Sequence, residues 1–97
     1  MAVAPPGSRR AFDPDLPARL HPLVALRDEA FGALAYHYGN RRLTFLRDAA
    51  LVSLVRDLGH HRSVDDALEA ASIEVARRPS FRTALRSLAE SEVIRAR

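Results

Sequence analysis

Two neighbouring stretches in the first half of the chain alternate between side chains of two kinds, and this pattern restricts both to β-strands. Alternate positions of residues 31–38 share one face, and Leu43 and Phe45 share one face of residues 42–47. A shorter apolar run, residues 24–26, precedes them and ends at a charged turn. The first half of the chain therefore predicts three short antiparallel strands.

The turn between the second and third strands is predicted from Gly39 and Asn40. Both residues tolerate a positive φ, which a two-residue hairpin requires. The third strand then has no following strand in the sequence to pair with. We expect it to be an edge strand, flanked by arginines, and an edge of this kind needs something to cover it.

Helical periodicity replaces the alternation after residue 47. Asp48 is a suitable N-cap for a helix that ends at Gly59, and Ser63 is the N-cap of a second, shorter helix. Pro79 suits the first turn of a third helix, which continues to about Ser91. Residues 73–78 fit either a loop or an early turn of that helix. Three strands followed by three helices predict an α+β domain.

Length and composition exclude several classes of protein. The 97 residues allow one domain, which we expect over residues 19–97 behind a flexible N-terminal arm of residues 1–18. There is no cysteine, and the longest apolar run is too short to span a bilayer. No nucleotide-binding or hydrolase motif occurs, and the adjacent His60 and His61 lack a carboxylate at metal-site spacing. We expect a soluble, cytoplasmic protein without a metal, a cofactor or catalytic activity.

All 15 residues of the Lys and Arg class are arginines, and two groups of them lie at predicted elements. One group surrounds the third strand and the other lies on the last helix. A solvated charged surface explains such groups as well as a binding site does. If the helix lies beside the strand, however, the two form a groove in which an acidic segment could add as a fourth strand. The predicted peptide-binding residues are Arg41, Arg42, Leu43, Thr44, Phe45, Leu46 and Arg47 on the strand, and Phe81, Arg82, Leu85, Arg86 and Ala89 on the helix.

The run FDPDLPARLHPLVALRDEAFGALAYHYGNRRLTFLRD, followed by LVSLVRDLG and LRSLAESEVI, resembles the mycofactocin-system peptide chaperones. That family belongs to the PqqD-like group of precursor-peptide recognition elements. The resemblance covers about residues 12–97 and is most specific around His21-Pro22 and over residues 31–34, 36–37 and 41–46. One departure is the pair Arg77-Arg78 directly before Pro79, where relatives carry more acidic or neutral residues.

The resemblance implies a winged-helix-like PqqD-type domain that binds the leader of a ribosomally made precursor peptide as an added β-strand. It also implies delivery of that peptide to a radical SAM maturation enzyme, which would hold the iron–sulfur cluster and the S-adenosylmethionine. The leaders bound by the family tend to be acidic and aliphatic. We expect a monomer or weak homodimer that binds neither nucleic acid nor membranes.

Two other functions stay open at this point. A winged helix could bind DNA, with arginines of the last helix contacting phosphates, although the second helix is acidic and the net charge is only +3. The chain could also be a structural subunit of a larger enzyme, in which case it would associate with that enzyme in the absence of any peptide.

Overall fold

The computed structural model describes residues 12–97. Residues 1–11 of the predicted arm lie outside the described residues. The rest of that stretch is fixed to the domain: Phe12 packs against the core, and the Pro14 carbonyl accepts a hydrogen bond of 3.1 Å from the Asp65 amide.

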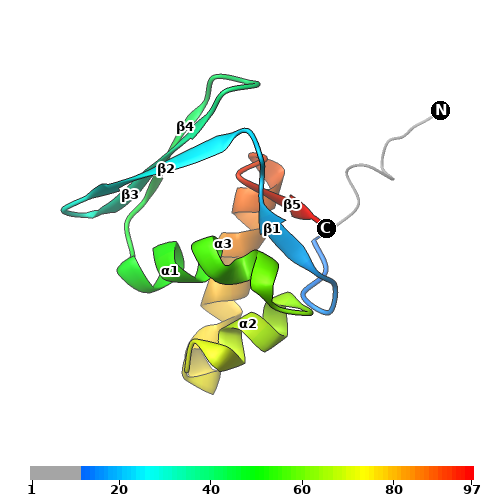
Figure 1. The fold of residues 1–97 in the computed structure, drawn as a ribbon. Coiled ribbons are helices and arrows are strands. Elements are labelled where there is room, and N and C mark those ends of the chain that lie inside the picture. The colour runs from blue at the N-terminus through cyan, green and yellow to red at the C-terminus, as the bar shows by residue number, and fades with distance from the viewer. Residues whose placement is uncertain (1–11) are drawn as a thin grey trace.

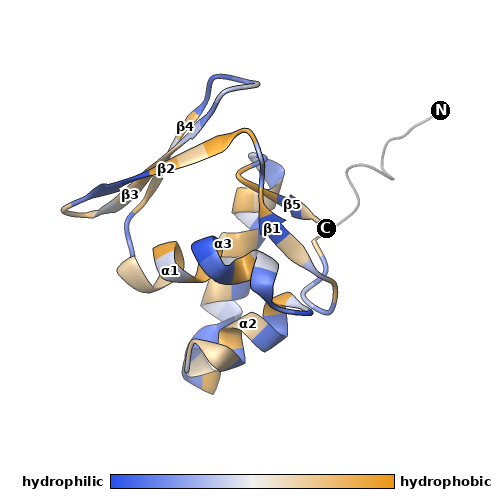
Figure 2. Ribbon diagram, in the orientation of Figure 1, coloured by the Kyte–Doolittle hydropathy of each residue, from blue (hydrophilic) through white to orange (hydrophobic). Residues whose placement is uncertain are grey.

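Three antiparallel strands form a sheet in the order β2-β3-β4, as the alternation predicts (Figure 1). Their bounds are Val24–Glu29 for β2, Gly32–His37 for β3 and Leu43–Leu46 for β4. Strand β2 begins with hydrophobic residues and becomes hydrophilic towards the β2–β3 turn (Figure 2). The prediction of a three-stranded antiparallel sheet is confirmed.

Three helices follow the sheet, which confirms the α+β prediction. The bounds are Ala49–Asp57 for α1, Val64–Ala70 for α2 and Arg78–Glu90 for α3, with short 3-10 turns at Leu58–His60 (η1) and Val75–Arg77 (η2). Both predicted N-caps are present: the Asp48 carboxylate accepts from the amides of Ala50 and Leu51, and the Ser63 hydroxyl accepts from Asp66. None of the helices in residues 12–97 has the length and apolar character needed to cross a membrane.

A second, two-stranded sheet joins the two ends of the described chain and was not predicted. Strand β1, Ala18–Leu20, pairs antiparallel with β5, Ile94–Ala96 (Figure 1). A strand of three residues is too short to show alternation, so no local pattern predicts this pairing.

The core lies between the inner face of the three-stranded sheet and the helices. Helix α1 packs against β3 and β4, and it approaches closely because the inner face of β3 presents the small Ala33 and Ala35, both fully buried. From α3 the buried side chains are Phe81, Leu85 and Leu88, the predicted apolar stripe. Val93 and Ile94 close the core after α3 ends.

Three predicted details are wrong. The charged residues 27–29 do not form a turn but continue β2, and the β2–β3 turn follows them. Gly39 and Asn40 do not adopt positive φ, and the β3–β4 connection is longer than two residues: the His37 amide donates to the Arg42 carbonyl, and Arg41 takes the left-handed conformation at φ 66°. Gly59 does not end α1 in a left-handed conformation either, but lies inside η1.

The glycine that the fold requires is Gly32, at the start of β3. Its φ is +143°, and a Cβ atom there would collide with the Leu46 carbonyl of β4. This close approach sets the distance between β3 and β4 at the end of the hairpin.

Candidate functional site

Strand β4 exposes a row of backbone hydrogen-bonding groups. In an antiparallel pair, hydrogen-bonded and non-hydrogen-bonded residue pairs alternate. His37 donates to the Arg42 carbonyl, so the register makes Ala35–Thr44 a hydrogen-bonded pair and leaves the backbone of Leu43 and Phe45 pointing away from β3. Within residues 12–97, no strand pairs with this side of β4. We call the N–H and C=O groups of Leu43 and Phe45 the β4 edge.

The side chains of β4 divide between two faces. Leu46 and Thr44 lie on the inner face, where Leu46 is buried. Leu43 and Phe45 lie on the outer face, where they are 59% and 51% exposed. The β4 edge is therefore bordered by apolar surface that water reaches.

Two aromatic rings and an arginine form a cluster on this outer face. The rings of Phe31 and Phe45 stack with centroids 5.6 Å apart. The Arg47 guanidinium lies 5.5 Å from the centre of the Phe31 ring and 5.2 Å from that of Phe45, within cation–π distance. We call Phe31, Phe45 and Arg47 the outer cluster. Phe31 was not among the predicted site residues, because it precedes β3 in the sequence and only the fold brings it next to Phe45.

Charge distinguishes the β4 edge from the opposite edge of the sheet. Among the described residues, Arg41, Arg42 and Arg47 form no ion pair with a carboxylate. On β2, by contrast, Arg27 binds Glu29 at 2.7 Å, and Asp28 binds Arg56 of α1 at 2.6 Å. The cations near β4 are thus available to an acidic ligand, whereas the charges of β2 are already neutralised.

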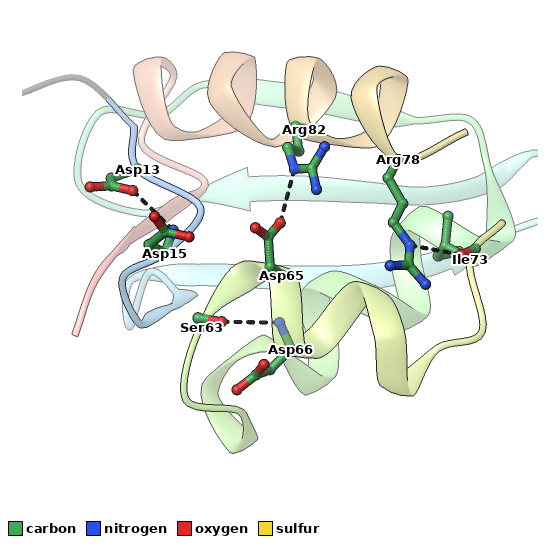
Figure 3. Close-up of polar contacts among 8 residues, drawn as sticks. All are labelled: Asp13, Asp15, Ser63, Asp65, Asp66, Ile73, Arg78 and Arg82. Atoms are coloured by element: carbon green, nitrogen blue, oxygen red, sulfur yellow. Dashed lines mark hydrogen bonds and ion pairs between the residues drawn. The ribbon is translucent and has the colours of Figure 1, made fainter. Parts of the chain in front are cut away.

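The α3 residues of the predicted site lie in other surroundings. Phe81 and Leu85 are core residues, and Ala89 is half-buried. Arg82 donates to the Asp65 carboxylate of α2 at 2.9 Å, as Figure 3 shows, and Arg86 lies over the Phe12 ring. The structure thus brings residues 41–47 together, but it points both arginines of α3 towards α2 and Phe12.

The residue directly before α3 approaches the N-cap of α1, two positions beyond the end of β4. Arg77, directly before α3, lies 3.7 Å from the carboxylate of Asp48, the residue that joins β4 to α1. Its guanidinium also lies 5.1 Å from the centre of the Phe81 ring.

The comparisons with known proteins agree with one another. The model of the peptide chaperone MftB family matches residues 17–95. A peptide chaperone MftB of Mycobacterium ulcerans (strain Agy99) is 43% identical over 84 residues, which cover 87% of this chain and 77% of the relative. The peptide chaperone MftB of Mycobacterium tuberculosis (strain ATCC 25618 / H37Rv) is 39% identical over 95 residues, covering 94% of this chain and 87% of the relative.

The chain belongs to the peptide chaperone MftB family. These matches confirm the resemblance seen in the sequence. Membership of this family indicates a role in mycofactocin biosynthesis. No solved structure matches the chain.

One polar cluster of this MftB-family chain could not be found from the sequence. His21, His37 and Glu92 are far apart in the sequence, yet their side chains come together in the fold. Each offers one atom that can bind a metal, and these three atoms lie within 4.8 Å of one another. His37 is only 4% exposed, and its Nε2 atom has no hydrogen-bond partner in the part of the chain that the structure describes. The two histidine rings lie 4.4 Å apart.

The hydrogen bonds of the two rings make this cluster a poor metal site. The Nδ1 atom of His37 accepts from the amides of Gly39 and Asn40 at 2.9 and 3.1 Å, and Nδ1 of His21 accepts from Leu23 at 3.0 Å. In a neutral ring the proton is then on Nε2, the atom that would have to bind the metal. The cluster instead fixes the β3–β4 turn, because the side chain of His37 holds two of its amides.

Burial lowers the pKa of His21 below its ordinary value, and the charges of His37 and Arg95 lower it further, whereas Glu92 acts in the opposite direction. Protonation of His21 is therefore less favourable in the folded chain than in the unfolded chain.

Proposed function

We propose that this chain is the peptide chaperone that binds the leader of the mycofactocin precursor peptide as a strand beside β4 and presents it to a radical SAM maturation enzyme. Membership of the MftB family supports the chaperone role. The observation that carries the proposed binding mode is the β4 edge, whose backbone groups are unpaired within residues 12–97. An extended peptide pairs with such an edge through its own backbone.

Charge favours β4 over the other edge of the sheet as the place where an acidic leader binds. Arg41, Arg42 and Arg47 surround β4 without a carboxylate partner in the described chain. On β2, Asp28 and Glu29 are each paired with an arginine, so this edge offers no free cation to an acidic peptide. An acidic, aliphatic leader therefore fits β4 in both backbone pattern and charge.

The energetics require side-chain contacts in addition to backbone pairing. The β4 edge offers two N–H and two C=O groups. At about 0.5–1.5 kcal/mol for each hydrogen bond, these groups contribute roughly 2–6 kcal/mol. Micromolar affinity requires about 8 kcal/mol, and ordering a flexible peptide costs several more. Apolar side chains of the leader, at about 1.5–3 kcal/mol each when buried, supply the difference.

The remaining parts of the proposal rest on the resemblance. A PqqD-type, winged-helix-like arrangement, a cytoplasmic location and a monomer or weak homodimer are what relatives of this kind imply. The α3 residues of the predicted site stay a prediction. Since Arg82 is held by Asp65, it reaches a peptide only after leaving that ion pair.

Titration with a synthetic leader peptide, followed by amide shifts of the labelled chain, tests the binding mode. The control is the same peptide N-methylated at alternate residues, which removes the donors that would face β4 without changing the charge. The proposal expects shifts centred on residues 42–47 and loss of binding for the control. Equal binding of both peptides would contradict it.

A further inference from the structure

The outer faces of β3 and β4 carry large apolar side chains, whereas β2 presents Arg27 and Glu29 on the same side. On a sheet with one solvated face, polar residues normally point outwards. Here Leu34 and Tyr36 point outwards from β3, opposite Phe45 and Leu43 of β4. Four of the seven exposed large apolar side chains of the described chain lie on or beside this face: Phe31, Tyr38, Leu43 and Phe45. A contiguous apolar surface of this kind indicates a surface that is covered when the protein works.

No helix of residues 12–97 covers this surface, since α1 packs on the opposite, inner side against Ala33 and Ala35 (Figure 1). Its chemistry is apolar and cationic: the outer cluster places the Arg47 guanidinium over two rings, and no carboxylate of the described residues pairs with it. The ligand that complements it has an aliphatic or aromatic group beside a carboxylate.

Strand geometry determines which part of a bound peptide reaches the outer cluster. A residue directly opposite Phe45 in an added strand projects from the same face as Phe45, with its Cβ atom about 4.5–5.5 Å away. The backbone of Phe45 points to the open edge while its ring lies on the outer face, so one residue provides both the pairing groups and a side-chain contact.

We propose that the outer cluster is a specificity site for the outward-facing side chains of the bound peptide. This inference rests on the proposed strand addition and extends it. Antiparallel pairing is slightly more stable per residue and continues the order of the sheet, so we assign that direction to the peptide. Counted from the N-terminal side of the peptide, its outward residues are then a carboxylate, an apolar residue and a second apolar residue, each two positions after the last. They lie opposite Arg47, Phe45 and Leu43 respectively.

A second copy of the chain is a poor occupant of the same surface. Pairing of two β4 edges would bring the unpaired arginines of both copies together without adding a carboxylate for either Arg47. Like charges opposite each other in a sheet are destabilising. The charge of the surface thus favours an acidic peptide.

A charge exchange tests this assignment. The probes are two synthetic peptides. One has the pattern acid-x-apolar-x-apolar and the other has lysine in place of the acid, and x is threonine in both. We expect Arg47→Glu to weaken binding of the acidic peptide about three- to tenfold and to strengthen binding of the lysine peptide by a similar factor. Arg62→Glu, at a fully exposed site in the linker before α2, is the matched control and should change both affinities less than twofold.

Truncation of the rings supplies a second measurement. Phe31→Ala should weaken binding of the acidic peptide, although Phe31 contributes no edge hydrogen bond, whereas Val75→Ala, at another exposed apolar position, should not. Nuclear Overhauser contacts from the first outward apolar side chain of the peptide should reach the Phe31 and Phe45 rings. Melting curves of each variant confirm that the fold is retained.

The outcomes separate the two proposals. Peptide binding that protects the amides of Leu43 and Phe45 but ignores Arg47→Glu and Phe31→Ala would overturn the specificity site and leave strand addition intact. Absence of protection at these amides would overturn strand addition itself. Self-association of the free chain that Phe45→Ala abolishes would assign the surface to a second copy and would also overturn the inference.

Discussion

A pair of proline substitutions on β4 separates the role of its edge from the stability of its sheet. The register directs the amide of Thr44 to Ala35 of β3 and the amide of Phe45 to the open side. Proline removes the amide donor and is tolerated in a strand only where that donor faces solvent. Thr44→Pro should therefore destabilise the fold, and Phe45→Pro should chiefly weaken peptide binding.

The magnitudes follow from the hydrogen bonds lost. Thr44→Pro leaves the carbonyl of the buried Ala35 without its donor, at a cost of about 1–3 kcal/mol in the free energy of unfolding. Phe45→Pro removes one hydrogen bond to the peptide, about 0.5–1.5 kcal/mol, or about a two- to thirteenfold loss of affinity. Phe45→Ala is the reference for Phe45→Pro, because both remove the ring and only one removes the donor.

Urea unfolding and calorimetric titration with the leader peptide measure the two effects. The reasoning predicts a lower unfolding free energy for Thr44→Pro, and unchanged stability with weaker binding for Phe45→Pro relative to Phe45→Ala. The reverse assignment, with Phe45→Pro unfolding the chain and Thr44→Pro abolishing binding alone, would refute the register argument. Equal affinities of Phe45→Pro and Phe45→Ala would refute the edge contact.

Further predictions concern other parts of the fold. Gly32→Ala should destabilise the chain by about 1–3 kcal/mol in urea unfolding, because alanine disfavours φ +143° and its Cβ meets the Leu46 carbonyl. His37→Ala should cost more stability than His37→Asn, whose oxygen can still accept from the Gly39 amide; equal losses would contradict the role of Nδ1. The pKa of His21 is lower in the folded chain than its unfolded value of about 6.5. The contribution of His21 to the free energy of unfolding is therefore complete above that value and declines as the pH falls below it. Melting curves of His21→Asn between about pH 7 and 5 should lack this part of the pH dependence. The double variant Arg82→Glu, Arg86→Glu should bind the leader more weakly if the predicted α3 contacts form. Wild-type affinity of this variant in calorimetry would show that these two arginines do not contact the peptide.

Alternation predicted β3 and β4, a short apolar run predicted β2, and helical periodicity predicted the three helices. The caps Asp48 and Ser63 were also readable, since each precedes an apolar stripe. The two-stranded β1–β5 sheet was not, because it joins segments more than seventy positions apart that are only three residues long.

The candidate site was predictable on the strand and less so on the helix. Alternation places Leu43 and Phe45 on one face, and that is where the structure has them. The directions of the arginine side chains at α3 depend on tertiary partners. Arg82 binds Asp65 and Arg77 approaches Asp48, and no local sequence pattern predicts these two pairs. The β3–β4 turn differed for a similar reason, since the side chain of His37 replaces the backbone pairing of a tight hairpin.

Amide hydrogen exchange of the labelled chain, with and without the leader peptide, tests strand addition most directly. In the free chain the amides of Leu43 and Phe45 have no partner among residues 12–97, whereas Thr44 is paired with β3. We predict that the peptide slows exchange at Leu43 and Phe45 and leaves Thr44 nearly unchanged. Protection confined to α3, with Leu43 and Phe45 exchanging as in the free chain, would contradict binding at this edge.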